Sequence, residues 1–503
     1  MSFVVTNAQM KAAEAESDRT GLSYGQLMYM AGTQCAKNIS RIIEDKDVNI
    51  AILCGSGNNG GDGYVIAKKL AEMNYYCISV ISVNGEPKTD CAKIHCENLH
   101  LENRIVFQPR ELFEHVISCA DVVVDCIYGT GFHGALPENV AKLLDEANNC
   151  PVRIAVDVPS GVNSDTGECD TRCFKPTHTL VIAAMKQGLL SPECNDMLGE
   201  ISLLDIGITD RCYKEYTARL TDNSMARPFP PRKRSSHKGT FGKLMNIAGC
   251  FSYNGAAAMS TKAALRTGAG LVMLASTRSV IAMHASAMNE ATYLPLPETE
   301  DGFIADGALS LITDALAKMN AVSLGCGMGN NETTRKIAEA VVLKADCPII
   351  IDADGINALS ANIDILKERK GAAILTPHPL EFSRLSGLSV KVIQSDRIGA
   401  AKRFAAEYGA VVVLKGANTV VASPDGEVYV NLTGNAGLAR GGSGDVLTGI
   451  IAGMLAQGID PFKAAVCGVY CHARAADILL DRLPMESMLP TDVIAALAEV
   501  FRN

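Results

Sequence analysis

A glycine-rich segment that carries one carboxylate is the stretch of this sequence best suited to chemistry. Its core is Gly441-Gly442-Ser443-Gly444-Asp445, and an apolar, helix-like run follows. A glycine-rich turn that opens a helix presents free backbone N–H groups and the positive end of the helix dipole, so it suits a phosphoryl group in transfer. Asp445 could then take a proton from a substrate hydroxyl. The alternative is a glycine-rich helix cap without a ligand.

A second glycine-rich stretch, residues 55–63, follows an apolar run and precedes a helix that we expect over residues 64–73. Its first six residues match G-x-G-x-x-G, the dinucleotide fingerprint. That fingerprint also needs an acidic residue about 20 positions later to hold a ribose, and no acid occurs there before Glu86. We therefore expect a polar loop for phosphate and ribose, or for a cation, and no ordinary hydride-transfer site.

Polar side chains also follow three expected strands of the first half. Asn59, Asp125 and Ser160 stand at such positions and offer oxygen atoms that could bind one cation. Asp157 lies close to Ser160 in the same segment. Ligands bind at the carboxyl edge of an open parallel sheet, so we expect a site there. Taken singly, each aspartate could equally cap a turn or a helix.

Four segments of the second half could line a pocket with Asp445. Small residues around Ala256 and in the loop 325–329 allow a ligand to approach the backbone. His378 stands between two prolines that fix its backbone, although a lone histidine is more often structural. Residues 415–419, beginning with a lysine and a glycine, could contact nucleotide phosphate. Whether Asp352 and Asp354 bind a metal is left open.

Apolar runs alternate with helical segments in both halves, which predicts an α/β protein with mostly parallel sheets covered on both faces. We expect a boundary near residue 215, giving domains 1–215 and 216–503. The basic, proline-rich segment 227–234 suits an exposed linker, with a phosphate contact as the alternative. The expected strands are 48–54, 77–83, 120–125, 152–157, 179–183, 243–249, 320–325, 348–352, 372–375 and 410–414, and a helix is expected over 256–267.

Composition narrows the class of protein. The 503 residues are 48% hydrophobic and 20% charged, which is typical of globular domains. A net charge of −9 argues against a nucleic-acid binder but allows a nucleotide substrate. The 17 cysteines follow no zinc-binding pattern. We find no signal peptide and no apolar run of about 18 residues, so we expect a cytoplasmic protein with free thiols and no membrane partner.

The first half resembles the NAD(P)H-hydrate epimerase family over roughly residues 1–210, through the segments 58–63, 125–131 and 157–161. The resemblance implies a Rossmann-like fold and inversion at C6 of the hydrated nicotinamide ring. It implies a potassium ion among Asn59, Asp125 and Ser160, and Asp157 as the substrate-binding, proton-handling group. The two loops implied to hold the hydrated dinucleotide are Asn58, Asn59, Gly60, Gly61 and Asp62, and then Gly129, Thr130, Gly131, Phe132, His133, Gly134 and Ala135.

The second half lacks a P-loop and the protein-kinase signatures. It resembles the ribokinase-like superfamily, and more closely NAD(P)H-hydrate dehydratase, through segments at 237–239, 268–272, 352–357, 376–379 and 444–447. The resemblance implies that Asp445 deprotonates the ring hydroxyl, which attacks a nucleotide's terminal phosphoryl group. It implies magnesium with ADP or ATP, substrate contacts at Ala256, Gly329, His378 and Asp445, and nucleotide contacts at Lys415, Gly416, Ala417, Asn418, Thr419 and Gly444.

Together the halves resemble the bifunctional NAD(P)H-hydrate repair enzymes, in which an epimerase is fused to a dehydratase. The resemblance further implies a homo-oligomer. Two alternatives stay open: a small-molecule kinase with a regulatory first half, and a dinucleotide-binding module without catalysis. The residues do not reveal a choice between ADP and ATP, or between NADH hydrate and NADPH hydrate.

Overall fold

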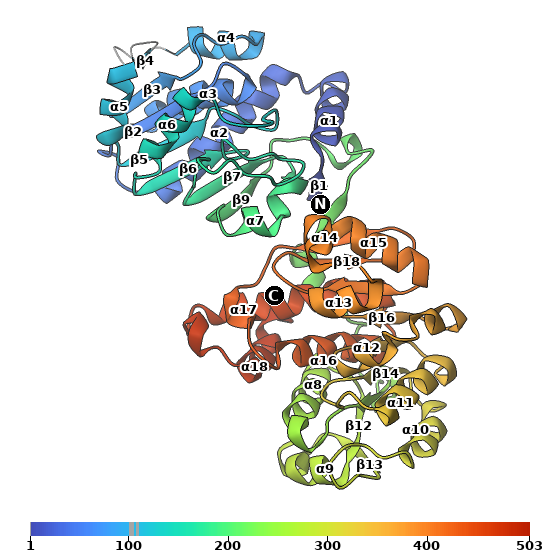
Figure 1. Ribbon diagram of the computed structural model, residues 1–503. Coiled ribbons are helices and arrows are strands. Elements are labelled where there is room, and N and C mark those ends of the chain that lie inside the picture. Colours follow the sequence, from blue (N-terminus) through green and yellow to red (C-terminus); the bar gives the residue numbers. More distant parts are fainter. Residues whose placement is uncertain (1, 100–104, 107–109, 503) are drawn as a thin grey trace. The chain divides into compact units, whose positions relative to one another are not determined.

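The computed structural model describes residues 2–99, 105, 106 and 110–502. By contacts the chain divides into two compact units, Met1–Arg219 and Leu220–Asn503, each an α/β structure (Figure 1). No helix within the described residues is long and apolar enough to cross a membrane.

The main sheet of the N-terminal unit is parallel, with the strand order β4-β3-β2-β5-β6-β7-β9. The short β1 pairs with β8 and β10 apart from it. The strands are β1 (Phe3–Val5), β2 (Ile50–Cys54), β3 (Ile78–Ser82), β4 (Ile105–Val106), β5 (Val122–Cys126), β6 (Val152–Val156), β7 (His178–Ile182), β8 (Met185–Lys186), β9 (Glu200–Leu204) and β10 (Ala218–Leu220). The helices are α1 (Asn7–Arg19), α2 (Tyr24–Ile42), α3 (Asn58–Glu72), α4 (Asp90–Glu97), α5 (Arg110–Ser118), α6 (Glu138–Ala147) and α7 (Pro192–Asn195).

Both faces of this sheet are covered, as expected from its continuous apolar strands. Alternate residues of β2 point to opposite faces. Ile50 and Ile52 pack with α2 and α3, whereas Ala51 and Leu53 pack with α5 and α6. The strand order reverses between β2 and β5, so the segments that follow these two strands meet at a switch point, where ligands bind in such sheets.

The helix after β2 begins earlier than predicted. We expected a helix over 64–73 after a glycine loop, but α3 starts at Asn58, so three of the glycines belong to the helix. A Cβ atom at Gly61 would lie 2.5 Å from Sδ of Met28, and one at Gly63 would lie 2.5 Å from Sγ of Cys54. These glycines therefore let α3 pack closely against α2 and β2.

The C-terminal unit contains the sheet order β13-β12-β11-β14-β15-β16-β17-β18-β19, parallel up to β17 and antiparallel beyond it. Its strands are β11 (Lys243–Ile247), β12 (Leu271–Thr277), β13 (Thr292–Leu296), β14 (Ala321–Leu324), β15 (Ile349–Ile351), β16 (Ala373–Leu375), β17 (Val411–Leu414), β18 (Thr419–Ala422) and β19 (Val428–Asn431). Its helices are α8 (Asn254–Thr267), α9 (Arg278–His284), α10 (Ala308–Leu316), α11 (Glu332–Lys344), α12 (Asp354–Leu359), α13 (Pro379–Ser386), α14 (Val390–Ser395), α15 (Arg397–Tyr408), α16 (Ser443–Ala456), α17 (Pro461–Leu479) and α18 (Pro490–Val500).

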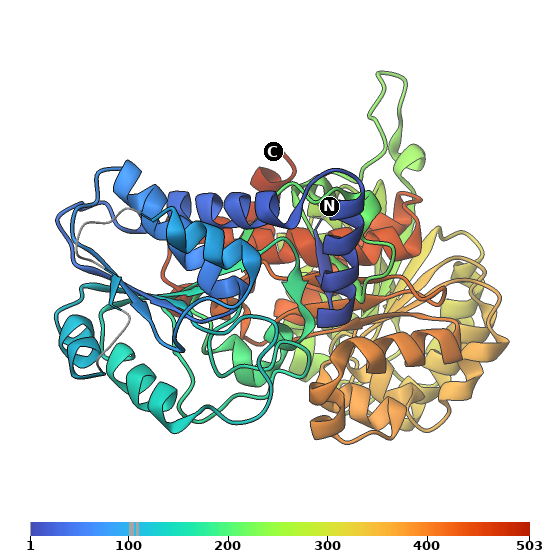
Figure 2. The same cartoon turned by 90° about the horizontal axis from the view of Figure 1, so that it is seen from above.

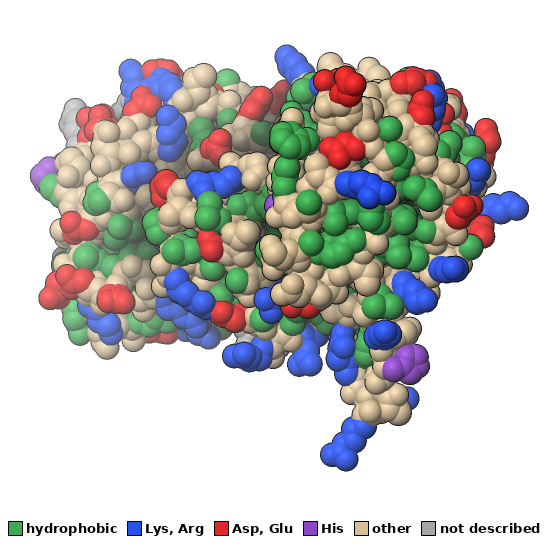
Figure 3. Space-filling view, turned by 90° about the horizontal axis from the view of Figure 1, so that it is seen from below, with side chains coloured by type: hydrophobic (Ala, Val, Ile, Leu, Met, Phe, Trp, Pro, Cys, Tyr) green, Lys and Arg blue, Asp and Glu red, His purple; other side chains and the backbone are tan. Residues whose placement is uncertain are grey.

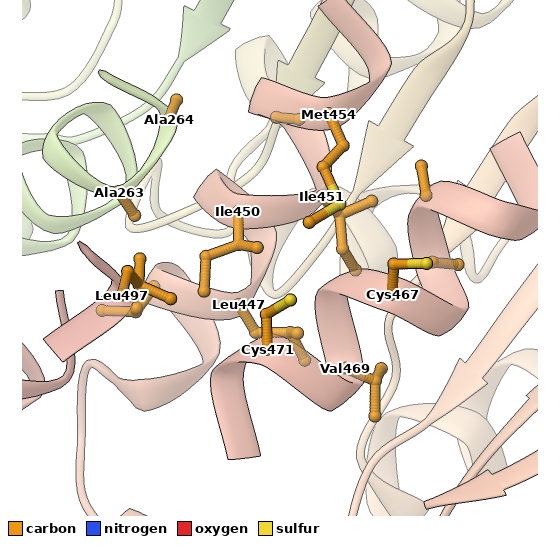
Figure 4. Packing of buried hydrophobic residues seen from close by; sticks show 14 of the residues in the cluster. Ala263, Ala264, Leu447, Ile450, Ile451, Met454, Cys467, Val469, Cys471 and Leu497 are labelled. Carbon is orange, nitrogen blue, oxygen red and sulfur yellow. The ribbon is translucent and has the colours of Figure 1, made fainter. Parts of the chain in front are cut away.

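This unit is also three-layered. Helices α8, α16, α17 and α18 pack on one face of the sheet, where Ala263, Ile450 and Leu497 meet in a continuous apolar core (Figure 4). Helices α10–α13 cover the opposite face (Figure 1). The ten expected strands lie in these two sheets, with ends that differ by one or two residues. The strands β4, β9, β12, β13, β18 and β19 were not predicted.

The basic connection 227–234 lies in an exposed loop that projects from the C-terminal unit (Figure 2), and Lys and Arg side chains run along this loop (Figure 3). Arg232 anchors part of this segment: it stacks on the ring of Phe241, with its Cζ 3.8 Å from the ring centroid, and donates to the Gly268 carbonyl. Lys233 and Arg234 are exposed. This arrangement fits the expected exposed linker.

Candidate active sites

A cavity of about 490 Å³ opens at the switch point of the N-terminal unit. Eight of the predicted site residues line it, namely Asn58, Asn59, Asp62, Gly129, Thr130, Gly131, Phe132 and Asp157. The other predicted substrate-loop residues, Gly60, Gly61, His133, Gly134 and Ala135, are not among the lining residues. Gly60 faces inward, where a Cβ would lie 1.9 Å from the Gly55 carbonyl oxygen.

Asp157 is held firmly at this cavity. Its Oδ1 accepts a hydrogen bond from the Ile182 backbone N–H (3.2 Å) and contacts the Lys186 ammonium in a close ion pair. Its φ angle is +70°, a left-handed conformation that costs free energy in a non-glycine residue. A strained backbone beside a buried ion pair is typical of a functional position.

Two further carboxyl groups face the same cavity, Asp62 on α3 and Glu14 on α1. Burial is the main cause that raises the pKa of Asp62 well above its ordinary value, and the charge of Asp157 adds to it. Burial and Asp157 also raise the pKa of Glu14. Both pKa values therefore move in the direction of the neutral carboxyl form.

Of the three residues expected to bind a cation, Asp125 and Ser160 contact each other and Asn59 lines the cavity. Asp125 is fully buried and accepts hydrogen bonds from the Ser160 N–H (2.7 Å) and the Ser160 hydroxyl (2.7 Å). Burial raises the pKa of Asp125 to about 6. Asn59 donates through Nδ2 to the carbonyls of Tyr128 and Val156, whereas its buried Oδ1 has no hydrogen-bond partner within the described residues. The unpartnered amide oxygen suits a cation ligand, whereas both oxygens of Asp125 already accept hydrogen bonds.

In the C-terminal unit, Asp445 lies in the first turn of α16, directly after the glycine-rich turn, as predicted. The helix is fixed by close packing against α8, since a Cβ at Gly449 would lie 2.2 Å from the Ser260 carbonyl oxygen. Leu447, Ile450 and Ile451 anchor its apolar face in the core (Figure 4). The core thus sets the position of Asp445.

The environment of Asp445 raises its pKa to about 6. Burial is the largest cause, followed by the negative charge of Asp352, while a hydrogen bond from the Cys326 thiol and the charge of Lys415 act in the opposite direction. The Sγ of Cys326 and carboxylate oxygens of Asp352 and Asp445 lie within 4.8 Å of one another. A carboxylate with such a pKa is well matched to a general base near neutral pH.

Lys415 reaches this group from the end of β17. Its Nζ lies 2.7 Å from Oδ1 of Asp352, whose Oδ2 accepts from the Thr448 hydroxyl (2.8 Å). Gly444 adjoins this pair, because a Cβ built on it would lie 3.4 Å from the Lys415 Nζ. Both oxygens of Asp352 therefore have protein partners.

His378 joins the same cluster through Glu381. The Nε2 of His378 lies 3.4 Å from Oε1 of Glu381, and Oε2 of Glu381 lies 3.9 Å from the Lys415 Nζ. The Nδ1 of His378 accepts from the N–H groups of Leu380 and Glu381 and so caps α13. The histidine thus has a structural task, and its ring is half exposed.

The loop after β14 brings the remaining predicted substrate residues together. The Gly329 N–H donates to Oδ2 of Asp354 (2.8 Å), which fixes the loop. A Cβ at Gly327 would lie 2.9 Å from the Cβ of Ala256, and one at Gly329 would lie 2.4 Å from the Phe303 ring. Asp354 therefore has a structural partner here, as Asp352 does.

The turn predicted to hold a nucleotide, residues 415–419, is braced by a residue that sequence reasoning missed. Buried Arg397 donates to the carbonyls of Leu414 (3.0 Å) and Lys415 (3.1 Å). Gly416 and Ala417 are exposed at the tip, Gly416 with a φ of +143° that favours glycine, and Asn418 has a φ of +56°. Thr419 closes the turn by donating to the Gly416 carbonyl (2.8 Å).

Sequence reasoning missed three groups next to the two aspartates: Lys186, Glu14 and Cys326. Lys186 stands just after the end of an expected strand, so the edge-of-sheet argument could have found it. Glu14 lies on a helix with no distinguishing pattern, and Cys326 resembles an ordinary small core residue in the sequence.

Both halves of the chain match known protein families. Residues 244–499 match the NAD(P)H-hydrate dehydratase family model, and residues 24–188 match the model of the YjeF-related protein N-terminus. The bifunctional NAD(P)H-hydrate repair enzyme Nnr of Moorella thermoacetica is 36% identical, covering 95% of this chain and 92% of its own length. The enzyme of the same name from Escherichia coli is 34% identical, covering 96% of this chain and 91% of its own.

A solved structure resembles the C-terminal unit. The ADP/ATP-dependent NAD(P)H-hydrate dehydratase of Bacillus subtilis, co-crystallised with ATP and Mg²⁺, is 34% identical with a TM-score of 0.50. The match covers 56% of this chain and 97% of that one. The relatives match nearly end to end and both halves match their own family models, so this chain belongs to the family of bifunctional NAD(P)H-hydrate repair enzymes.

Proposed function

We propose that the chain restores hydrated NADH and NADPH in two steps. The N-terminal domain, residues 1–215, interconverts the R and S forms at C6, and the C-terminal domain, residues 216–503, dehydrates the S form at the expense of ADP or ATP. The observation that carries the proposal is the placement of Asp445, with its pKa raised to about 6, in the first turn of a helix behind a glycine-rich turn. This combines a general base with an anion site.

The dehydration then follows from ordinary phosphoryl chemistry. Asp445 accepts the proton of the ring hydroxyl, and the hydroxyl oxygen attacks the terminal phosphorus of the nucleotide while the bond to the leaving phosphate oxygen breaks. Backbone N–H groups at the start of α16 stabilise the transferring charge. Phosphate then leaves the ring carbon with its bonding electrons, the adjacent C–H gives its proton to the released phosphate, and the dihydropyridine double bond is restored.

The N-terminal cavity supports the epimerisation. Asp157 accepts the proton of the C6 hydroxyl, the C6–N1 bond breaks, and a carbonyl forms at C6 while N1 takes up a proton. Closure on the opposite face reverses these proton transfers and gives the other epimer. Asn58, Asp62 and residues 129–132 line the space that would hold the ring and its dinucleotide.

The residues present suit the expected potassium ion better than a magnesium ion held by protein carboxylates. The unpartnered Oδ1 of Asn59, with Asp125 and Ser160, fits a potassium ion that would order the substrate loops. In the C-terminal domain, Asp352 and Asp354 already accept hydrogen bonds, so we propose that magnesium is held chiefly through the nucleotide phosphates. Magnesium would neutralise part of the phosphate charge.

We also propose a cytoplasmic location and a homo-oligomer, which stay predictions.

Nucleotide consumption tests this proposal. With hydrated NADH and Mg²⁺, purified protein should release one inorganic phosphate for each NADH regenerated, with ADP or with ATP. A stable phosphorylated dinucleotide or another phosphorylated small molecule would instead favour the ribokinase-like kinase alternative. Absence of nucleotide consumption with either donor would refute the dehydratase assignment.

A further inference from the structure

Lys186 is a buried cation at the floor of the N-terminal cavity. Only 1% of the residue is exposed, and its Nζ contacts both Oδ1 of Asp157 and the carbonyl oxygen of Ile182 (2.6 Å). Burying an ammonium is costly unless it is paired, so such a lysine needs a compensating role. The two contacts fix its position on the short strand β8.

The contacts of the Asp157 carboxylate are one-sided. The Lys186 ammonium and the Ile182 N–H both reach Oδ1, and within the described residues no hydrogen bond is found to Oδ2. The backbone N–H of Asp157 donates to the Leu180 carbonyl (2.8 Å), which helps to hold the left-handed φ of +70°. Asp157 lines the cavity, so this arrangement leaves Oδ2 as the oxygen available to a ligand.

The ionisable groups around this pair are mostly carboxyl groups. Glu14 of α1 and Asp62 of α3 line the same cavity, together with the cation Lys11 of α1, and the thiol of Cys35 on α2 faces Asp157 and Lys186. Without Lys186, Asp157 would be a third carboxyl group in this cavity without a paired cation, and the cavity already raises the pKa of the other two. The lysine is thus the group that can keep a negative charge in the centre of this cluster.

We infer that Lys186 is the positioning residue of the epimerase site: it anchors Oδ1 of Asp157 so that Oδ2 takes and returns the proton of the C6 hydroxyl. This inference rests on the proposed epimerase function. Lys186 itself exchanges no proton with the substrate. Its ammonium stabilises the carboxylate, and the proton moves between Oδ2 and the substrate hydroxyl as the C6–N1 bond opens and closes.

The test compares Lys186→Met and Lys186→Arg with wild type, measuring epimerisation of hydrated NADH over a range of pH. We expect Lys186→Met to slow epimerisation on the order of 10²-fold, the lower end of a general-base contribution. Its activity should also require higher pH, because loss of the cation favours the protonated carboxylate. Lys186→Arg should recover part of the rate and of the normal pH profile. A matched control is Lys69→Met, which removes another largely buried lysine of the same unit that pairs with Glu72 away from the cavity.

A second measurement keeps the inference testable if Lys186→Met lowers stability. In the Asp157→Asn background, Lys186→Met should cause no further loss of epimerisation, since both changes remove the same function. Independent, multiplicative losses would overturn the inference, as would an unchanged pH profile in the single variant. If wild type itself does not accelerate epimerisation, the proposed function fails, and that result is distinct from a failure of the lysine's role.

Discussion

Each of the two sites places one aspartate at the edge of a parallel sheet, but the nearby lysine has a different partner in each site. Asp157 forms a direct ion pair with buried Lys186. Near Asp445 the lysine is instead bonded to a second carboxylate, Asp352, and burial raises the pKa of Asp445 to about 6. In one site a lysine therefore contacts the functional aspartate directly, whereas in the other the lysine pairs with a neighbouring carboxylate and the functional aspartate has a pKa suited to proton exchange near neutral pH.

Glycines also serve the two sites differently. Gly60, Gly61 and Gly63 are buried within α3 and allow close packing. Gly441 is exposed and Gly442 and Gly444 are partly exposed at the start of α16, where backbone N–H groups can reach a ligand. Similar glycine-rich sequences thus support packing in one unit and ligand approach in the other.

Asp445→Asn is expected to have the largest effect on the dehydratase. Loss of a general base should slow ADP- or ATP-dependent dehydration of the S form by about 10²–10⁴-fold, because asparagine cannot accept the hydroxyl proton. Epimerisation should be unchanged, and it can be followed by chromatographic separation of the R and S forms. A variant that still dehydrates at the wild-type rate would show that Asp445 is not the base.

Asp157→Asn should give the reciprocal result. Epimerisation should fall by about 10²–10⁴-fold, while dehydration of purified S form continues at the wild-type rate. The two assays are run on the same preparation, so each activity serves as the folding control for the opposite unit. Equal loss of both activities would contradict the separation of the two sites.

Lys415→Met should mainly affect stability of the C-terminal unit. The change leaves Asp352, of whose side chain only 2% is exposed, without its cation, and breaking a buried pair typically costs about 3–5 kcal/mol. Calorimetry should show a lower Tm for the C-terminal unit and an unchanged transition for the N-terminal unit. Lys391→Met, at an exposed lysine, is the control and should leave both transitions unchanged.

Dehydration should also depend on pH in a way that identifies Asp445. Its pKa is raised from 3.8 to about 6, so the base is protonated and inactive below that pH and active above it. The rate measured as kcat/KM should fall below pH about 6. Cys326→Ala should shift this fall to higher pH, because the thiol hydrogen bond lowers the pKa of Asp445. A Cys326→Ala profile that moves to lower pH would contradict the described hydrogen bond.

Gly329→Ala should have the smallest effect on activity, and it tests the close contact between Gly329 and Phe303 in the substrate loop. The φ of +81° costs an alanine about 1–2 kcal/mol, and the new Cβ would lie 2.4 Å from Phe303. We expect a higher KM for the hydrated dinucleotide with kcat nearly unchanged. Gly387→Ala, with a φ of +71° and open space around it, controls for backbone strain alone.

The sequence predicts the fold well because its apolar runs are continuous. Strands such as β11 and β17 lie within two residues of the expected ranges, and the glycine turn before Asp445 opens a helix as predicted. The predicted start of α3 was wrong. Glycine occurs both in flexible loops and at close contacts between elements, and the sequence alone does not distinguish these two cases.

The sites were predictable where function follows a strand end and less so where it depends on tertiary contacts. Asp157 and Asp445 follow from local motifs. The pairing of Asp157 with Lys186 joins residues 29 positions apart, and that of Asp352 with Lys415 joins residues 63 positions apart. No local sequence pattern indicates contacts between residues so far apart in the chain. Lys186 was therefore missed, and Lys415 was predicted only as a phosphate contact.

Recovery of absorbance at 340 nm from a mixed solution of R and S hydrated NADH tests the central claim most directly. With ADP or ATP and Mg²⁺, wild-type protein should restore the full NADH signal, because epimerisation feeds the dehydratase. Asp157→Asn should stall near the S fraction plus what epimerises spontaneously. Full recovery by Asp157→Asn at the wild-type rate, or no recovery by wild type with either nucleotide, would contradict the account of two cooperating sites.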